Sequence, residues 1–193
     1  GLKAFSGKDG RVRLFRVEEN AKRMINSGSY LKMAVPTVEM FTKACIEAVK
    51  LNAEYIPPYG SGASLYLRPM LIGVGPQVGV HPSKDYMFIV FVTPVGPYYK
   101  NGFNCIKVII DYDHDRAAPK GTGHVKVRGN YAASLDSGEI AHDNGSATVT
   151  LLDPPKKQYI HDCLAANLFA IPHPNTTPPD SPPTLPPTPN NRP

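Results

Sequence analysis

The chain has 193 residues, of which 41% are hydrophobic and 19% charged, a composition typical of a globular protein with a buried core. Its net charge of +5 comes from lysines and arginines scattered along the sequence. A nucleic-acid partner needs a dense basic patch, so it is disfavoured, and a small anionic ligand is favoured. Three widely spaced cysteines, Cys45, Cys105 and Cys163, argue against a disulfide framework and against a zinc site.

No window approaches the roughly 18 uninterrupted apolar residues of a membrane-spanning helix. The sequence starts at Gly1 without a basic and then apolar leader, so no targeting segment is predicted. These features predict a protein of a reducing compartment, the cytoplasm, with no membrane partner.

The first 95 residues predict four strands and two helices. Residues 2–5 and 11–15 flank the Asp9-Gly10 turn and predict a hairpin. One helix is expected to begin near Glu18, and Thr37 is expected to cap a second helix from Val38 to about Leu51. The residues expected in the core from this second helix are Val38, Met40, Phe41, Cys45, Ala48 and Val49. Residues 64–73 and 85–95 alternate as strands do, and that alternation predicts Tyr66 and Arg68 on one face of the sheet.

The second half predicts three strands around a glycine-rich centre. Residues 105–110, 148–152 and 158–164 fit strands. The acidic run 111–115 contains His114 and could hold a metal, but a solvated turn is the favoured interpretation. From residue 172 the chain is rich in proline and is expected to be disordered.

Residues 121–135 contain the lysine around which a catalytic hypothesis can be built. His124–Val127 fits a short strand, Gly129-Asn130 a turn and Tyr131–Ala141 a helix, with Ala132, Leu135 and Ile140 toward the core. At the end of a buried strand, Lys126 would be desolvated, which would lower its pKa and favour the neutral amine that attacks a carbonyl. The alternative is a solvated surface lysine.

Several runs resemble a known family when taken together. The sequence AAPKGTGHVKVRGNYAASL, residues 117–135, resembles the cofactor-lysine segment of branched-chain amino-acid aminotransferases, which are fold-type IV pyridoxal-phosphate enzymes. GLKAF, LFRVEENAKRM, PPYGSGASLYLRP, LIGVG and FVTPVGPYYKNG follow the same family in the same order. The resemblance implies an α+β, two-domain chain. A small N-terminal domain is expected over residues 1–97, an interdomain loop over 98–106, an incomplete large cofactor domain over 107–171 and a disordered tail over 172–193.

The resemblance also implies a site and assigns its residues. Lys126 would hold pyridoxal phosphate and move the substrate proton. Arg23 would bind the phosphate, Tyr131 the phenolic oxygen and Asp162 the pyridine nitrogen, where the family has a glutamate, while Arg116 matches an arginine near the cofactor. The substrate pocket would contain Tyr66, Arg68 and Tyr98, and no metal is expected.

The implied activity is transfer of the amino group of leucine, isoleucine or valine to 2-oxoglutarate by a homodimer. Another type IV enzyme, such as a D-amino-acid transaminase or an aminodeoxychorismate lyase, is a rival, but LYLRP and GPYYKNG favour the branched-chain group. Arg128 and Leu164 stand where the family has glycines, Pro187 falls in its phosphate loop, and relatives are much longer. A fragment or impaired copy, or a non-catalytic interaction domain that keeps the scaffold, is therefore the alternative from another class.

Overall fold

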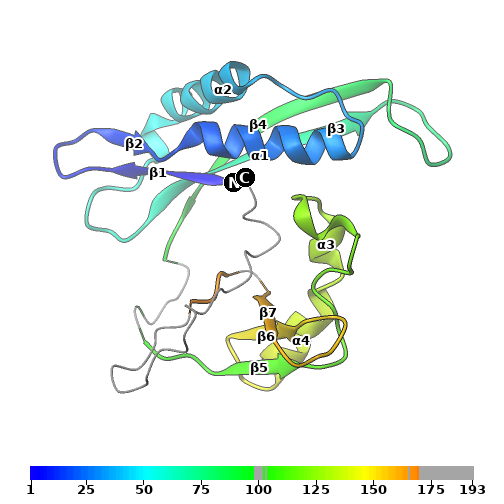
Figure 1. Cartoon of the computed structure of the whole chain (residues 1–193). Helices are drawn as coiled ribbons and strands as arrows, with labels where there is room; N and C mark the ends of the chain where they lie inside the picture. The colour runs from blue at the N-terminus through cyan, green and yellow to red at the C-terminus, as the bar shows by residue number, and fades with distance from the viewer. Residues whose placement is uncertain (98–101, 103, 165, 170–193) are drawn as a thin grey trace, which may run out of the picture. The chain divides into compact units, whose positions relative to one another are not determined.

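The computed structural model describes residues 1–97, 102, 104–164 and 166–169, and the chain divides into two compact units, Gly1–Phe103 and Asn104–Pro193 (Figure 1). The predicted interdomain loop spans the division between the units, and its residues 98–101 and 103 lie outside the described residues, as does the predicted tail. The predicted domain limits stay predictions. None of the helices in the described part of the chain has the length and hydropathy needed to cross a membrane.

The N-terminal unit is built on a four-stranded antiparallel sheet. Its strands are β1 (Leu2–Ser6), β2 (Val12–Leu14), β3 (Ser64–Val74) and β4 (Asp85–Val95), in the order β2-β1-β3-β4. The β1–β2 turn has Gly10 at φ 73°, a left-handed conformation that glycine adopts readily. Beside it the Asp9 carboxylate accepts two hydrogen bonds from the Arg13 guanidinium, at 2.8 and 2.6 Å. The hairpin and the two long strands predicted from the sequence are confirmed.

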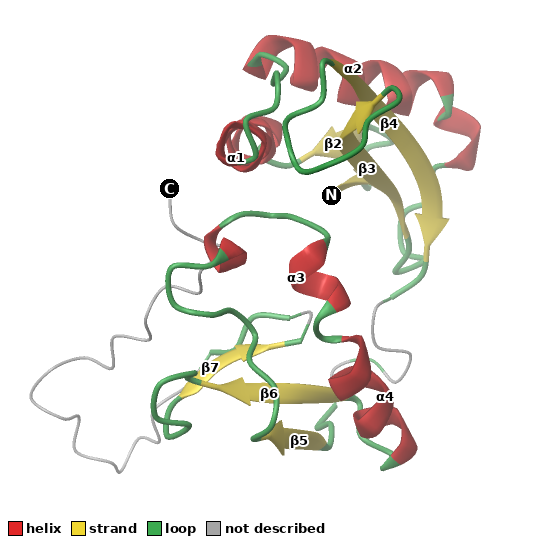
Figure 2. Ribbon diagram, turned by 90° about the vertical axis from the view of Figure 1, so that its right-hand side faces the viewer, coloured by secondary structure: helices red, strands yellow, loops and turns green. Residues whose placement is uncertain are grey.

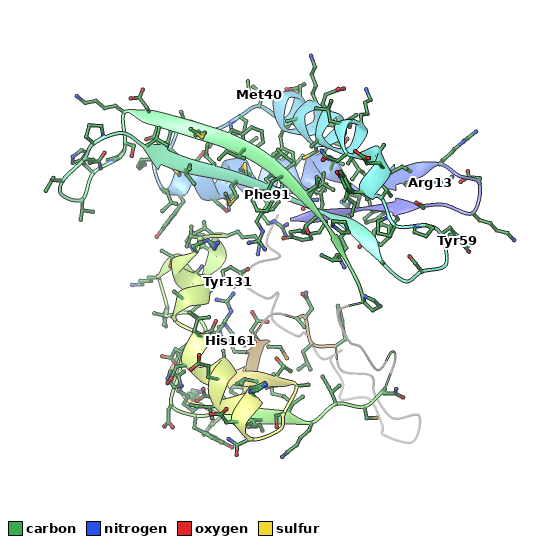
Figure 3. The ribbon with its side chains drawn as sticks, turned by 180° about the vertical axis from the view of Figure 1, so that it is seen from behind. Arg13, Met40, Tyr59, Phe91, Tyr131 and His161 are labelled. Carbon is green, nitrogen blue, oxygen red and sulfur yellow. The ribbon has the colours of Figure 1, made fainter. Side chains whose placement is uncertain are left out.

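Two helices, α1 (Val17–Tyr30) and α2 (Val38–Leu51), cover one face of this sheet, and a short 3₁₀ turn, Ala53–Tyr55, follows them (Figures 1 and 3). The Thr37 hydroxyl accepts the Met40 N–H at 3.1 Å, so the predicted cap and the predicted bounds of α2 are confirmed. The buried core between the helices and the sheet consists of Leu2, Ala4, Val17, Ala21, Phe41, Cys45, Val49, Leu65 and Leu67.

Two residues of α2 show how sharply helix geometry divides core from solvent. Cys45 lies one turn after Phe41 on the buried stripe, and burial raises the pKa of its thiol to about 11, so the thiol is a neutral packing group. Met40 was predicted in the core, and that prediction is wrong because Met40 is 56% exposed. One residue along a helix turns the side chain by about 100°, which carries Met40 out of the stripe that contains Phe41.

The C-terminal unit contains a three-stranded sheet of β5 (Val108–Asp111), β6 (Thr148–Leu152) and β7 (Ile160–Cys163), in that order. Strand β5 runs parallel to β6, and β7 runs antiparallel to β6. The crossover from β5 to β6 contains a 3₁₀ turn (Thr122–His124), α3 (Gly129–Ala132) and α4 (Leu135–Asp143) (Figure 2). Helix α4 packs on the sheet through Ala141, against Val149, Leu151 and Ile109.

The predicted strand at His124–Val127 is wrong, and so is the single helix from Tyr131 to Ala141. Within the described part of the chain no strand pairs with residues 124–127; the segment is a 3₁₀ turn followed by loop, and the helix is interrupted at residues 133–134. The predicted apolar stripe is wrong as well, because Leu135 is 68% and Ile140 45% exposed, and Ala132 is exposed too. The small residues Ser137 and Ala141 are buried in their place. The outer strands are also shorter than predicted, since β5 begins at Val108 and β7 ends at Cys163.

Candidate active site

The loop before Lys126 is fixed by one buried asparagine. The Asn130 side-chain amide donates to the backbone oxygens of Thr122, at 2.7 Å, and Val125, at 2.9 Å, while the Thr122 hydroxyl donates to the Asn130 carboxamide oxygen at 2.6 Å. Val125 is also buried, and its N–H bonds the Thr122 carbonyl at 3.1 Å. These bonds replace the missing strand ladder, so the backbone that carries Lys126 is held although it has no regular structure.

Lys126 itself is exposed, with its amine resting on Tyr131. The amine donates a hydrogen bond to the Tyr131 hydroxyl and lies 4.5 Å from the centre of the tyrosine ring. The spacing of five residues spans the turn into α3 and brings the two side chains together. The prediction of a desolvated lysine at the end of a buried strand is wrong. What positions the amine here is a neighbouring phenol, within the same unit.

Arg116 and Asp162 form a buried ion pair next to this tyrosine. The two residues are 5% and 6% exposed, and Arg116 Nε lies 3.6 Å from Asp162 Oδ2. The Arg116 guanidinium carbon lies 5.3 Å from the centre of the Tyr131 ring, and its Nη1 donates to the Asn130 carbonyl at 3.5 Å. The pairing is incomplete, because Arg116 Nε makes no hydrogen bond in the described part of the chain.

The acidity of Asp162 is set by two opposing effects. Burial raises the pKa of its carboxyl, since water no longer stabilises the negative charge. The positive charge of Arg116, a 2.9 Å hydrogen bond from the Cys163 N–H and the nearby His161 all act in the opposite direction. The upward effect is the larger, so the carboxylate depends on these neighbours to remain charged.

A β-bulge lies next to Asp162 in β7. Thr150 pairs with Cys163 and Leu151 with Asp162, but Leu152 pairs with Ile160, so His161 is an extra residue in β7. Directly opposed residues of antiparallel strands share a face, and Asp162 therefore lies on the same face as the core residue Leu151. The Nδ1 atom of His161 is buried and has no hydrogen-bond partner among the described residues. His161 and Tyr131 are both labelled in Figure 3.

The other predicted site residues lie in the N-terminal unit, except for one that is not among the residues that the structure describes. Arg23, in α1, is partly buried and donates from Nη2 to the Asn20 side-chain oxygen at 2.9 Å. Arg68 lies with its guanidinium carbon 5.4 Å from the centre of the Tyr66 ring, so the prediction that these side chains share a face is confirmed. Tyr98 is among the residues that the structure does not describe. The binding roles of all four residues stay predictions.

Known proteins resemble this chain both in sequence and in structure. No family model matches the chain. It is 49% identical over 174 residues to the branched-chain-amino-acid aminotransferase of Helicobacter pylori and 48% identical over 176 residues to that of Haemophilus influenzae. These alignments cover 90% and 89% of this chain. The chain belongs to the branched-chain-amino-acid aminotransferase family. It spans about half the length of the curated relatives it matches, 51% in each of these two.

Solved structures show that this chain has the fold-type IV architecture of the family over the part that it spans. The T.th. branched-chain amino acid aminotransferase complexed with N-(5'-phosphopyridoxyl)-L-glutamate matches it with a TM-score of 0.65 at 26% identity, over 84% of this chain and 50% of the other. The same enzyme with pyridoxamine 5'-phosphate matches with a TM-score of 0.67 at 25% identity. The α+β fold inferred from the resemblance is therefore confirmed.

One departure of this chain from the family pattern has a structural explanation. Leu164, at a family glycine, packs toward α4, where its Cδ2 would lie 3.2 Å from a Cβ added to Gly138. Gly138 thus leaves room for the leucine. Sequence reasoning missed the bulge at His161 and the Arg116–Asp162 pair, and the only signal for the pair was the match of each residue to a family position.

The acidic run after β5 is an ordered turn. Asp111 Oδ1 accepts the Asp113 and His114 N–H groups at 2.8 and 3.1 Å, and its Oδ2 accepts the Ser137 hydroxyl at 2.6 Å and contacts His114 Nδ1 at 2.9 Å. Lys157 Nζ adds an ion pair with Asp115 at 2.7 Å and a bond to the His114 carbonyl at 3.0 Å. Among the described residues no cluster of histidine, cysteine and acidic side chains has the arrangement of a metal site. The turn instead fixes the backbone leading to Arg116.

Asp111 is expected to make the stability of this unit depend on pH. Burial would raise the pKa of its carboxyl, but the hydrogen bonds from Ser137, Asp113 and His114 outweigh burial and hold the pKa below its usual value of 3.8. A lowered folded-state pKa contributes stability that is complete above 3.8 and is lost as the pH falls through the folded value. At pH 7 we expect Asp111→Asn to lower the free energy of unfolding by about 1–3 kcal/mol, because the amide turns one of the two acceptor oxygens into an NH₂ group that cannot accept a hydrogen bond.

The check is urea unfolding of the unaltered chain and of Asp111→Asn at neutral and acidic pH. The difference between them should shrink as the pH falls below the usual aspartate value. Asp136→Asn is the matched control, because Asp136 contacts His114 Nε2 at 3.3 Å with a side chain that is largely exposed. If the two substitutions had equal effects, the hydrogen bonds to Asp111 would not be the source of the stability.

Proposed function

We propose that this chain takes part in the transamination of leucine, isoleucine or valine, with 2-oxoglutarate as amino acceptor and pyridoxal 5'-phosphate held by Lys126. The observation that carries the proposal is the contact between the Lys126 amine and the Tyr131 hydroxyl, in a chain that is 49% identical to a branched-chain-amino-acid aminotransferase. The T.th. enzyme is complexed with a phosphopyridoxyl derivative in one structure and with pyridoxamine 5'-phosphate in another, which supports the same cofactor here.

The residues of the C-terminal unit fit such a cofactor in kind and in arrangement. The aldehyde carbon and the phenolic oxygen occupy neighbouring positions on the pyridoxal ring, and the Lys126 amine and Tyr131 hydroxyl are neighbours in the protein. Asp162 supplies a buried carboxylate for a ring nitrogen, and Arg116 Nε is a buried donor without a hydrogen bond in the described chain. When bound, pyridoxal phosphate provides an electron sink for negative charge on the substrate's α carbon.

Each protein group then has a definable task. Lys126 holds the cofactor through Nζ and, when that amine is free, carries the proton taken from the substrate. Tyr131 keeps Nζ directed by accepting its hydrogen bond, while the Asp162 carboxylate accepts from a protonated ring nitrogen. In the N-terminal unit we assign phosphate binding to Arg23 and substrate contacts to Tyr66 and Arg68, and we assign a further substrate contact to Tyr98.

We also infer a homodimer working in the cytoplasm, as an expectation from the family resemblance. Cys45, Cys105 and Cys163 carry free thiols, which supports a reducing compartment. The proposed partners are small amino acids and 2-oxo acids, and no nucleic-acid or membrane partner is proposed.

A non-catalytic scaffold is the second candidate, and one observation favours it. Asp162 already has Arg116 and the Cys163 N–H as partners, so the carboxylate has a structural role without any cofactor. Together with Arg128 and Leu164 at family glycines, this leads us to propose that transamination by this chain is impaired relative to its relatives, and that cofactor binding is the more robust property to test.

The test is a visible spectrum of the purified chain with pyridoxal 5'-phosphate, before and after borohydride reduction. We expect a reducible absorbance band in the unaltered chain, loss of the band in Lys126→Ala, and retention in Lys156→Ala, an exposed lysine of the same unit. Leucine should shift the band, whereas D-alanine should not. A chain without the band at saturating cofactor is the scaffold of the second candidate, and a band that survives in Lys126→Ala would assign the cofactor to another amine.

A further inference from the structure

The buried carboxylate of Asp162 has few groups that keep it charged. Its Oδ1 accepts the Cys163 N–H at 2.9 Å, and its Oδ2 lies 3.6 Å from Arg116 Nε. Among the described residues, the charged or titratable groups that act on it are Arg116, from the loop after β5, and His161, from β7 itself. Its cross-strand neighbour on β6 is Leu151, which carries no charge. Arg116 is therefore the principal counter-charge in its surroundings.

Arg116 also touches the aromatic partner of Lys126. Its guanidinium carbon lies 5.3 Å from the centre of the Tyr131 ring, and the Lys126 amine lies 4.5 Å from the same centre. The Nη1 group donates to the carbonyl of Asn130, the residue before Tyr131, at 3.5 Å. One side chain thus contacts both the carboxylate and the phenol to which the proposed function gives roles.

The arginine is held by contacts other than its carboxylate partner. The preceding turn is fixed by the hydrogen bonds to Asp111 and by the Lys157 contacts with Asp115 and His114. The bond to Asn130 adds a contact at the guanidinium. These contacts hold Arg116 in addition to its ion pair with Asp162.

From this geometry we infer that Arg116 is a positioning residue, which keeps the Asp162 carboxylate ionised for a ligand's protonated ring nitrogen and braces the Tyr131 ring beneath the Lys126 amine. The inference rests on the proposed function. A neutral carboxylic acid would offer that nitrogen a proton donor, whereas an ionised carboxylate offers an acceptor for its N–H. The incomplete Arg116–Asp162 bond leaves carboxylate capacity for such a ligand.

The test measures the ionisation of Asp162 in the cofactor-free protein. Carboxyl signals of ¹³C-labelled aspartate are followed by NMR across a pH titration, and the Asp162 signal is identified by its absence in Asp162→Asn. Removing the charge in Arg116→Met should move the titration midpoint upward by about 1–3 pH units, the usual effect of losing an opposite charge at this range. Arg116→Lys should restore most of the shift, and Lys107→Met, which removes an exposed charge of the same unit, should leave the midpoint unchanged.

Three outcomes would overturn the inference. One is an unchanged midpoint in folded Arg116→Met, and a second is an Asp162 signal that is already protonated at pH 7 in the unaltered chain. The second needs no variant and remains decisive if Arg116→Met fails to fold. The third is a Tyr131 ring signal that does not change between the unaltered chain and Arg116→Met, which would remove the bracing role.

The borohydride experiment separates this inference from the proposed function. If the Lys126 band is absent but Asp162 responds to Arg116→Met, the proposed function fails and so does the role toward a ring nitrogen, leaving a structural ion pair. If the band is present and the titration midpoint of Asp162 is the same in Arg116→Met as in the unaltered chain, the proposed function stands and the positioning role alone is wrong. If the Lys126 band is present and the Asp162 midpoint shifts in Arg116→Met, the pH at which the band changes should shift by a similar amount in Arg116→Met. In Arg116→Lys that pH should be close to its value in the unaltered chain.

Discussion

Asp162→Leu is expected to lower the free energy of unfolding of the C-terminal unit by about 3–5 kcal/mol, because it leaves the buried Arg116 guanidinium without its counter-charge. Arg116 is 5% exposed and cannot recover hydration without local opening. The effect can be measured by urea unfolding and by hydrogen exchange of the amides in β6 and β7. Both methods should report weaker protection in the variant, while the amides of α2 in the N-terminal unit serve as an internal reference.

The double variant Arg116→Met with Asp162→Leu is the decisive control. Replacing both members of a buried ion pair with apolar groups is often neutral or even stabilising, because the desolvation cost of two charges disappears. The 3.6 Å separation and the missing hydrogen bond at Arg116 Nε make this pair a weak contributor to stability. We expect the double variant to be markedly more stable than Asp162→Leu alone. If the two losses simply added, Arg116 and Asp162 would have no interaction energy in the folded protein, and the functional interpretation of the pair would lose support.

Phe41→Ala is expected to destabilise the N-terminal unit by about 3–5 kcal/mol, through lost apolar burial and the cavity left behind. Phe41 is almost fully buried, and its ring stacks on Phe88 of β4 with 5.8 Å between the centroids and 26° between the planes. The side chain therefore joins α2 to the sheet. Urea unfolding with hydrogen exchange of the α2 amides measures the loss.

Met40→Ala is the matched control, since it removes a large apolar side chain from the neighbouring position of the same helix. Met40 is exposed, so its replacement should change the free energy of unfolding by no more than about 0.5 kcal/mol. Equal losses for Phe41→Ala and Met40→Ala would mean that the buried stripe of α2 has been assigned to the wrong face.

Elements with strong local signals were predictable from the sequence. Asp9-Gly10 specifies a tight turn through backbone conformation, and Thr37 specifies a helix start through a side-chain hydrogen bond. Strand β6 has the bounds predicted for it, and so has α2. In each case the information lies within a few residues of the element, which is why it could be read without knowing what the element packs against.

The loop around Lys126 shows where local information fails. Its valine-rich sequence has the propensity of a strand, but in the described structure no neighbouring strand pairs with it, and the Asn130 carboxamide takes the backbone oxygens of Thr122 and Val125. Helix α4 deviates for a related reason, since Ser137 and Ala141 are small enough to approach the sheet and Leu135 points to solvent. In the loop around Lys126 and in α4, contacts with residues outside the segment outweigh the local secondary-structure propensity.

The candidate site divides in the same way. Lys126, Tyr131 and Asp162 were found as single residues through the family resemblance, and the contact of the first two across five residues is nearly local. Arg116 follows β5 and Asp162 lies in β7, and the two residues meet because β6 lies between these strands in the sheet. The local sequence around Arg116 does not predict a contact with Asp162, and the sequence around Asp162 does not predict one with Arg116.

By itself the sequence determined the family, the core helix α2, the β1–β2 hairpin and the choice of Lys126 as the candidate lysine, because turn chemistry, capping, periodicity and close homology act at each position separately. Only the tertiary structure decided that Lys126 is an exposed loop residue held by a phenol, and that its unit encloses a buried ion pair. Burial and charge pairing depend on distances between segments far apart in the chain, and those distances are set by how strands and helices pack.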